Sequence, residues 1–190
     1  ATCHSMIKFG IRTSYRLRTQ SRQGSDVTTI FPLLVGIAEG SSTQEVWRLA
    51  TDYFASLGFS RVNYGFTRFR SVRSIGDPDD ALYLTTASEA YAASYFRNGF
   101  YAKTPAFRWA RENEGATTWT WVREAYLAGK LSPIEMETVQ QNMAAGITAG
   151  ISISFPVTSA RAKGAMGLIA DPGLSAEDVD KIFADKQSEF

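Results

Sequence analysis

The stretch Gly146-Ile-Thr-Ala-Gly150-Ile-Ser-Ile-Ser-Phe155-Pro156 decides the fold that we predict for this chain. Glycines frame an apolar segment in which residues 150–157 predict a β-strand, and residues 164–170 predict its partner. The loop between the two strands carries Arg161 and Lys163, which we interpret as solvated charges rather than as an anion site. The C-terminal half of the chain is therefore expected to contribute a strand pair to a sheet.

A second strand pair is expected upstream. Residues 59–69 alternate between apolar and polar side chains, with Tyr64 among the apolar ones, as in a strand with one buried face. Residues 76–80 form a turn sequence, and residues 81–85 predict a short second strand. Because the connection is too short for a helical crossover, these two strands should pair antiparallel.

Helices are expected around these strands. Ser42 with Glu45 predicts a capping box at the start of an amphipathic helix that ends at Gly58. Ser132-Pro133 with Glu135 predicts the start of another helix. The apolar residues expected on one face of that helix are Ile134, Val139, Met143 and Ile147. Further helices are expected at 88–98, at 105–115 and from Ser175 onward.

The order of these segments predicts an α+β domain. Residues 117–122 are rich in Thr and Trp and should be extended, which brings the expected sheet to about five strands. A sheet with an apolar face must be covered by helices. We therefore expect an α-β-α sandwich around a mainly antiparallel sheet, with a cavity between the sheet and one helix layer.

The composition of the chain narrows the range of functions that we expect. The chain has 190 residues, 20 Lys+Arg against 19 Asp+Glu, and 44% hydrophobic residues, as expected for one domain with a substantial core. Its one cysteine, Cys3, and its one histidine, His4, lie at the N-terminus, so we expect neither a metal site nor an enzyme that relies on these side chains. No apolar run is long enough to predict a membrane helix.

The N-terminal segment differs from the remainder. Residues 6–25 are basic and free of acids, a composition typical of a targeting-like segment, a nucleic-acid-binding arm or a non-native remnant. We favour a flexible lead-in, as is common at chain ends. The expected division is an N-terminal extension at 1–40 and a sensor domain at 41–190.

Several aromatic and hydroxyl residues are spaced so that they could line a pocket. The set is Tyr91, Tyr95, Thr104-Pro105 and Trp119. Apolar walls with a few polar groups are usual in small-molecule sites. The structural alternative is that the aromatic residues are ordinary core residues and that Thr104 only caps a helix.

These residues and their spacing carry a resemblance. Tyr91-Ala-Ala-Ser-Tyr95 is followed by Thr104-Pro105 nine residues after Tyr95, and Trp119 lies fifteen residues after Thr104. Over about residues 43–185 the chain resembles the N-terminal autoinducer-binding domain of LuxR-type quorum-sensing transcription regulators, a PAS/GAF-like fold. That family has Trp and Asp where Tyr91 and Thr104 stand. The stretch 146–156 is similar to the family's glycine-framed strand, with its proline displaced by two residues.

The resemblance implies a binding site for an acyl-homoserine lactone between the sheet and a helix layer. By position, Tyr91 would take the role of the Trp that donates to the lactone carbonyl, and Thr104 that of the Asp that accepts from the ligand amide. Tyr95 would contact the amide carbonyl, and either Trp119 or Trp121 would pack on the lactone ring, because alternation places both on one sheet face. The remaining expected ligand-binding residues are Tyr64, Phe96, Phe107, Ile147 and Gly150, the last as a close-packing position.

The two exchanged residues change the expected ligand. A phenol places its donor elsewhere than an indole does, and Thr104 offers a neutral acceptor in place of a charged one. A neutral hydrogen bond contributes about 0.5–1.5 kcal/mol and a charged one about 1.5–3 kcal/mol, so an amide ligand should lose about one to two kcal/mol, which is about tenfold or somewhat more in affinity. We therefore expect an orphan-type domain that takes a non-lactone analogue or needs no ligand.

Three functions follow from this reading. The first is a ligand-sensing, homodimerising domain of a cytoplasmic transcription regulator, which would reach DNA only through a helix-turn-helix module not included in residues 1–190. The second is a ligand-independent interaction domain, such as an anti-activator that dimerises with a full-length regulator. The third, an enzyme, is disfavoured because no clustered acid pair or usable His or Cys is present. No cofactor and no membrane contact is expected.

Overall fold

The computed structural model describes residues 30–68, 80–157, 159 and 161–190 of the chain. The predicted turn at 76–80 lies outside these residues except for Asp80, and so does the basic segment at 6–25. A five-stranded sheet in the order β2-β1-β5-β4-β3 forms the centre of the molecule. The strands are β1 (Arg61–Thr67), β2 (Leu82–Thr85), β3 (Gly115–Thr118), β4 (Gly150–Ser154) and β5 (Lys163–Ile169).

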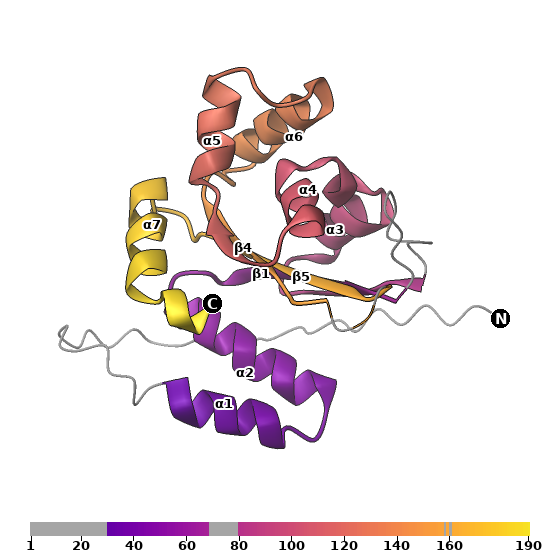
Figure 1. Ribbon diagram of the computed structural model, residues 1–190, viewed down its shortest axis with the longest axis vertical. Coiled ribbons are helices and arrows are strands. Elements are labelled where there is room, and N and C mark those ends of the chain that lie inside the picture. The colour runs from indigo at the N-terminus through magenta and orange to yellow at the C-terminus, as the bar shows by residue number, and fades with distance from the viewer. Residues whose placement is uncertain (1–29, 69–79, 158, 160) are drawn as a thin grey trace.

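All neighbouring strands in the sheet pair antiparallel. Both predicted strand pairs are present, since β1 pairs with β2 and β4 pairs with β5. The two pairs are joined because β1 also pairs with β5 along its whole length, from Arg61 opposite Ile169 to Thr67 opposite Lys163. The expected α-β-α arrangement is confirmed, with helices on both faces of this sheet (Figure 1).

One face of the sheet packs on a layer of helices that includes α2 (Thr43–Ser56) and α7 (Ala176–Asp185). The apolar core lies here, and Phe59, Val62, Ile151 and Leu168 are fully buried in it. The C-terminal Phe190 stacks on Phe54 of α2 and so returns the chain end to this core. Side chains fill this layer, which supports one face of the sheet.

The opposite face carries the helical segments that lie between β2 and β4 in the sequence (Figure 1). They are α3 (Glu89–Ala92), the π-helical turn η2 (Ala93–Arg97), the 3₁₀ turn η3 (Phe100–Lys103), α4 (Pro105–Glu112), α5 (Thr120–Leu127) and α6 (Pro133–Ala144). The predicted helix at 88–98 is thus a single α-turn continued by a wider π-turn. The helix starts predicted at Pro105, Ser132 and Ser175 are confirmed, each with a side-chain cap.

Some expectations were wrong. The chain is extended only as far as Thr118, and Trp121 lies on helix α5 rather than on a strand. Trp119 and Trp121 therefore do not share a sheet face. Ser42 does cap α2, but Glu45 accepts hydrogen bonds from the preceding residue, Ser41, rather than from Ser42, so the predicted capping box is incomplete.

The predicted apolar face of α6 and the predicted solvation of Lys163 were also wrong. Ile134 is 47% exposed and Met143 is 51% exposed, whereas Ile147 is buried beyond the helix end. Lys163 begins β5 and is only 8% exposed. Arg161, by contrast, is exposed as predicted.

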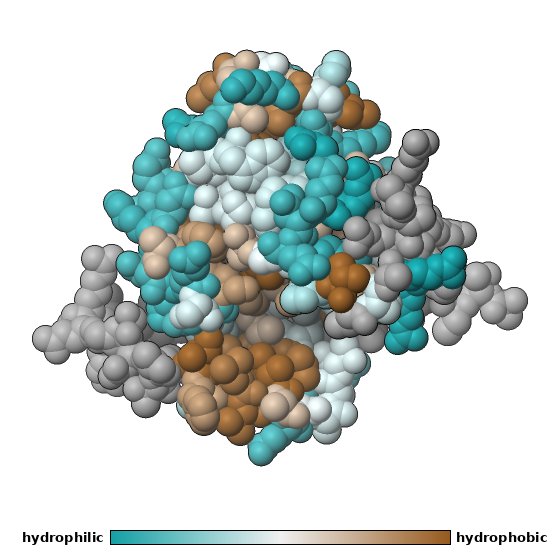
Figure 2. Space-filling model, in the orientation of Figure 1, coloured by the Kyte–Doolittle hydropathy of each residue, from teal (hydrophilic) through white to brown (hydrophobic). Residues whose placement is uncertain are grey.

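Helix α1 (Ile30–Glu39) precedes the part of the chain that we expected to be ordered. It packs against α2, and none of its residues is fully buried. Its outward face exposes Phe31, Leu34 and Val35. These residues form part of an apolar surface at the α1 end of the molecule (Figure 2).

Candidate ligand-binding cavity

The floor of a cavity is formed by small residues on the sheet face that carries α3 to α6. Gly65 pairs with Ala165, and Gly167 lies between Asn63 of β1 and Ser152 of β4 in one row across the sheet. A β-carbon built on Gly167 would meet no atom within 4 Å. The absence of side chains at these floor positions leaves space between the sheet and the helices.

The larger part of this space is an apolar chamber with about 820 Å³ of atom-free volume, which includes some open solvent. Aromatic rings dominate its walls: Tyr83, Tyr95, Phe96, Tyr101, Phe107 and Trp119. Tyr64 and Phe66 border the chamber from β1, but their side chains share the sheet face of Val62. Several of these rings contact each other, with Tyr101 edge-on to Phe107 at 5.0 Å between ring centres. Tyr83 donates a hydrogen bond to the Tyr101 hydroxyl at 2.9 Å, so the wall is fixed by polar as well as apolar contacts.

A smaller chamber of about 490 Å³ adjoins the first. Residues that line it include Tyr91, Thr104, Val139, Asn142 and Ile147. The residues shared by both chambers are Asn63, Tyr95, Ala106, Trp119 and Gly167. The two chambers therefore meet above Gly167, between Tyr95 on the π-helical turn and Trp119 at the start of α5.

Hydrogen bonds hold the residues at this junction in place. The indole Nε1–H of Trp119 donates to Ser152 Oγ at 2.9 Å. Asn63 Nδ2 donates to the Tyr91 hydroxyl at 3.1 Å, and Asn63 Oδ1 accepts from Thr85 Oγ1 at 2.7 Å. Because Ser152 holds its N–H, Trp119 presents a ring surface to the cavity rather than a free donor.

Thr104 is buried, and its hydroxyl serves the backbone. Oγ1 donates to the Tyr101 carbonyl at 2.8 Å and accepts from the Phe107 N–H at 3.2 Å, which caps helix α4. Burial raises the pKa of the neighbouring Tyr95, and the nearby Tyr91 raises it further, while a hydrogen bond with Thr104 opposes the rise. Tyr95 is therefore a neutral phenol at the junction.

Gly150 acts through Trp119. A β-carbon on Gly150 would lie 2.8 Å from Trp119 Cζ3 and would also collide with the Leu168 carbonyl oxygen. Only a glycine lets the indole ring lie against the strand at this point. Gly150 does not line either chamber, so it is a positioning residue for Trp119.

Comparisons with known proteins identify the fold and the family. The family model described as the autoinducer binding domain matches residues 42–188 of this chain. The chain belongs to the autoinducer-binding domain family. No curated protein matched the sequence.

Solved structures agree with the fold of this autoinducer-binding domain. CepR2 of Burkholderia cenocepacia, described as an N-acylhomoserine lactone dependent LuxR family transcription factor, is 16% identical, with a TM-score of 0.62 and coverage of 85% of this chain and 88% of that one. SdiA of Escherichia coli is 11% identical, with a TM-score of 0.56 and coverage of 83% and 67%. The VqsR LBD domain of Pseudomonas aeruginosa is 12% identical, with a TM-score of 0.52 and coverage of 83% and 89%.

The cavity of this autoinducer-binding domain gathers most of the residues expected from the sequence. Those that line one or both chambers are Tyr64, Tyr91, Tyr95, Phe96, Thr104, Phe107, Trp119 and Ile147. The structure does not bring Trp121 to the cavity. The centre of its ring, on α5, lies 5.9 Å from the guanidinium carbon of Arg108 on α4.

Sequence reasoning missed Asn63 and Ser152, which form the polar row across the floor together with Gly167. Both lie on predicted strands, and the alternation along each strand was the available signal. Alternation along β1 places the side chain of Asn63 on the sheet face opposite to that of Val62. It does not indicate which of the two faces carries the cavity. Lys163, Tyr83 and Tyr101 were missed as well, because no local pattern marks them.

In residues 30–68, 80–157 and 161–190, no group of three or more His, Cys, Asp or Glu side chains could hold a metal ion. Within the same residues, no helix is both long and apolar enough to span a membrane.

Proposed function

We propose that this domain senses a small, mostly apolar signal molecule, either an acyl-homoserine lactone or a non-lactone analogue. The observation that carries the proposal is the pair of joined chambers with Tyr95 and Trp119 at their junction. A polar head group fits the smaller chamber, and an apolar tail fits the aromatic walls of the larger one. Such a cavity, apolar with a few polar groups, has the features of a small-molecule site.

Within this proposal, Tyr95 and Tyr91 offer their hydroxyls to the head group, and Trp119 offers its ring. Thr104 contributes less, because its hydroxyl is already engaged by the Tyr101 carbonyl and the Phe107 N–H. A ligand amide at this position would compete with the cap of α4. This favours a ligand recognised through its carbonyl oxygens, which need donors, over one that needs a strong acceptor.

A thermal-shift screen of the purified domain tests this proposal. Acyl-homoserine lactones and non-lactone acyl compounds are added to the wild type, to Tyr95→Phe and to Trp119→Ala. A ligand present at about a hundred times its dissociation constant should add about 2.7 kcal/mol to the unfolding free energy. We expect a shift for the wild type and a smaller one for both variants; equal shifts in all three proteins would place the ligand elsewhere.

We also propose that the domain acts as the dimerising sensor of a cytoplasmic LuxR-type regulator, which would contact DNA only through a separate helix-turn-helix module. Family membership supports this assignment. The alternative, a ligand-independent interaction domain or anti-activator, is favoured by the engaged hydroxyl of Thr104. A domain that folds fully and dimerises without ligand, and that shifts with no compound in the screen, would support that alternative.

A further inference from the structure

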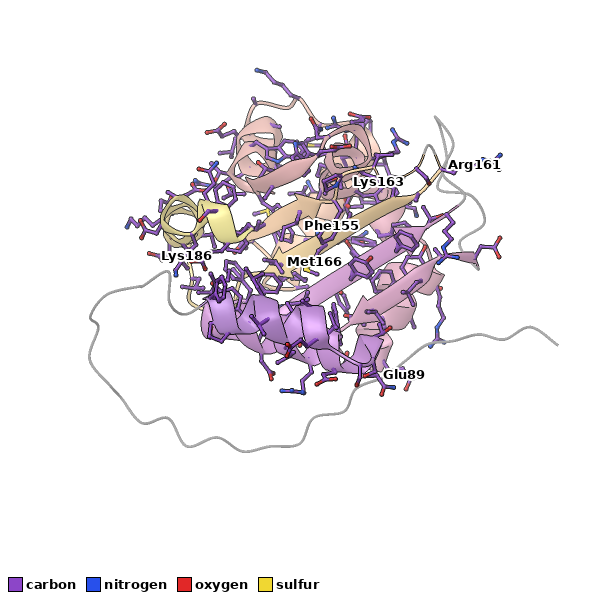
Figure 3. All side chains as sticks on the ribbon, turned by 60° about the horizontal axis from the view of Figure 1, so that its bottom comes forward. Glu89, Phe155, Arg161, Lys163, Met166 and Lys186 are labelled. Atoms are coloured by element: carbon purple, nitrogen blue, oxygen red, sulfur yellow. The ribbon has the colours of Figure 1, made fainter. Side chains whose placement is uncertain are left out.

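The smaller chamber is lined by uncharged residues. Among the described residues at its walls, the polar side chains are hydroxyl groups, one indole and the carboxamides of Asn63 and Asn142. Lys163 lines the larger chamber and begins β5, on the side of Arg161 (Figure 3), whereas Ile169 at the other end of this strand lines the smaller chamber. A strand rises about 3.4 Å per residue, so about 20 Å separate the two α-carbons. A head group in the smaller chamber is therefore recognised by neutral groups.

Most of these polar groups are already bonded to the protein. The Trp119 N–H donates to Ser152, and Thr104 Oγ1 bonds to two backbone groups. Both amide atoms of Asn63 are engaged, because Nδ2 and Oδ1 each bond to a neighbouring hydroxyl. These contacts fix the chamber wall and leave the three side chains little capacity to bind a ligand.

Asn142, in the last turn of α6, is different. Among the residues that the structure describes, none forms a hydrogen bond with its carboxamide. Its contribution to the fold is made by the backbone, since the Asn142 carbonyl accepts from the Ala145 N–H at 3.0 Å and from the Ile147 N–H at 2.8 Å. These bonds end α6 and hold the backbone of Asn142 in place, while its side chain keeps its full capacity to bind a ligand.

Helical spacing directs the Asn142 side chain inward. Thr138 and Val139 lie four and three residues before it, so the three side chains share one face of α6. Thr138 is buried, and Val139 lines the smaller chamber together with Asn142. The residues on either side of Asn142, Gln141 and Met143, are exposed. A carboxamide on the inward face, where an apolar side chain would also fit, indicates a polar partner in the chamber.

We propose that the ligand carries an amide in its head group and that Asn142 Oδ1 accepts a hydrogen bond from the amide N–H. The proposal rests on the proposed function, since it names the head-group chemistry and a specificity-determining residue in the same cavity. A carboxamide presents an acceptor and two donors, so Nδ2 can donate to a neighbouring carbonyl of the ligand at the same time. The Tyr91 hydroxyl, which accepts from Asn63, can donate its own hydrogen to a further carbonyl. The acceptor that Thr104 does not offer then comes from α6.

Matched probes test the N–H separately from the shape of the ligand. N-cyclopentyl decanamide and cyclopentyl decanoate share a ring and a chain, but the ester has an oxygen in place of the amide N–H. Dissociation constants for the wild-type domain are derived from thermal shifts at several concentrations of each probe. We expect the amide to bind about tenfold more tightly, because the ester leaves Asn142 Oδ1 unpaired. Equal binding would overturn the inference and leave the proposed function intact. Binding of neither probe would also overturn it, whereas the proposed function would stand if the wider screen gave a shift.

Variants assign the preference to a residue. Asn142→Leu should reduce the amide-to-ester preference to about one and leave the ligand-free domain folded, because the backbone carbonyl still makes the bonds that end α6. Asn142→Asp keeps an acceptor and should retain the preference. Gln141→Leu is the matched control, since it removes an exposed carboxamide from the same turn of α6 and should leave the preference unchanged. A preference that survives in Asn142→Leu would overturn the proposal. If Asn142→Leu does not fold, Asn142→Ala removes the same carboxamide without adding apolar volume and gives the same test.

Discussion

The hydroxyl of Thr104 shows how a single residue can link the scaffold to the site. It caps α4, and a carboxylate in its place would also be a good cap. An aspartate could not donate to the Tyr101 carbonyl, however, and would place a charge among buried aromatic rings. The same carboxylate would offer an acyl-homoserine lactone the charged acceptor that this cavity lacks.

Thr104→Asp should therefore exchange stability for lactone affinity. We expect the ligand-free variant to lose about 1–3 kcal/mol, because a buried acceptor is left without its donor and a charge is desolvated. The shift produced by an acyl-homoserine lactone should grow relative to the wild type. Thermal denaturation with and without lactone measures both effects, and Thr104→Ser, which keeps the hydroxyl, is the control. A variant that loses stability and gains no lactone shift would show that no ligand amide reaches this position.

Substitutions at Gly167 and Gly150 should have opposite outcomes. Gly167 faces open space, and a valine there fits a strand, so Gly167→Val should leave stability nearly unchanged while its side chain fills the junction of the two chambers. We expect the ligand-induced thermal shift to disappear. If Gly167→Val kept a wild-type shift, the ligand would not cross the junction.

Gly150→Ala should instead destabilise the protein. Its β-carbon would meet Trp119 and the Leu168 carbonyl oxygen, and the forced rearrangement should cost about 1–3 kcal/mol. Urea denaturation monitored by tryptophan fluorescence measures the loss. A Gly150→Ala protein as stable as the wild type would mean that the Trp119 ring can move away at little cost.

Between elements, the contact of α4 with α6 depends on one carboxylate. Glu135 accepts from Arg108 Nε at 2.6 Å and from the Ser132 N–H and hydroxyl at 3.0 and 2.8 Å. Burial on its own would raise the pKa of Glu135, but the hydrogen bonds from Arg108 and Ser132 outweigh it and lower the pKa. This carboxylate therefore ties together the helices that cover the smaller chamber.

A lowered folded-state pKa fixes the sign of the pH effect. Glu135 stabilises the fold at pH values above its unfolded pKa of about 4.3, and this contribution is lost as the pH falls through the lower folded value. Glu135→Gln should be less stable than the wild type at neutral pH, and the difference should shrink as the pH falls below about 4. Denaturant melts from pH 3 to 7 measure this difference; Glu137→Gln, exposed on the same helix, is the control. A difference that did not change with pH would exclude ionisation as its cause.

The elements that could be predicted from the sequence are those whose signals are local. The strand at Arg61–Thr67 follows alternation, the strand at Lys163–Ile169 follows the apolar run predicted at 164–170, and the starts of α4, α6 and α7 follow capping residues. Helix α5 was missed because Thr-Trp-Thr-Trp favours a strand, whereas Trp119 turns the chain into a helix once its indole bonds to Ser152 across the sheet. That contact is non-local, so no window of sequence contains it.

The residues of the candidate site could likewise be predicted only where the sequence itself carries a pattern. Tyr95, Trp119 and their neighbours could be placed because their spacing resembles a family pattern. Asn63 and Lys163 could not be placed, because their roles depend on the register between β1 and β5. Lys163 in particular is assigned to a solvated loop by sequence, and it is buried only because β5 starts there, opposite Thr67.

At the scale of the whole molecule, the sheet separates a densely packed helix layer from a helix layer that encloses the cavity. The face toward α2 and α7 holds the fully buried residues Phe59, Val62, Ile151 and Leu168. The face toward α3 to α6 holds the chambers. Cavities cost packing energy, so the hollow layer should depend on the filled one for its stability. A ligand that fills the chambers would then stabilise the whole domain.

The outer surface predicts how copies of the domain associate. Phe31, Leu34 and Val35 on α1 are 69%, 53% and 41% exposed, and the apolar surface they share is visible in Figure 2. A contiguous apolar patch on a soluble protein commonly marks an interaction surface. Since we propose a homodimer, α1 is the face at which the second copy should pack.

Leu34→Lys should then shift the protein toward the monomer in sedimentation velocity without lowering its melting temperature. Leu127→Lys is the matched control, because Leu127 is 72% exposed and lies on α5, at the opposite end of the molecule from α1 (Figure 1). A dimer that persists in Leu34→Lys and dissociates in Leu127→Lys would move the interface to α5 and α6.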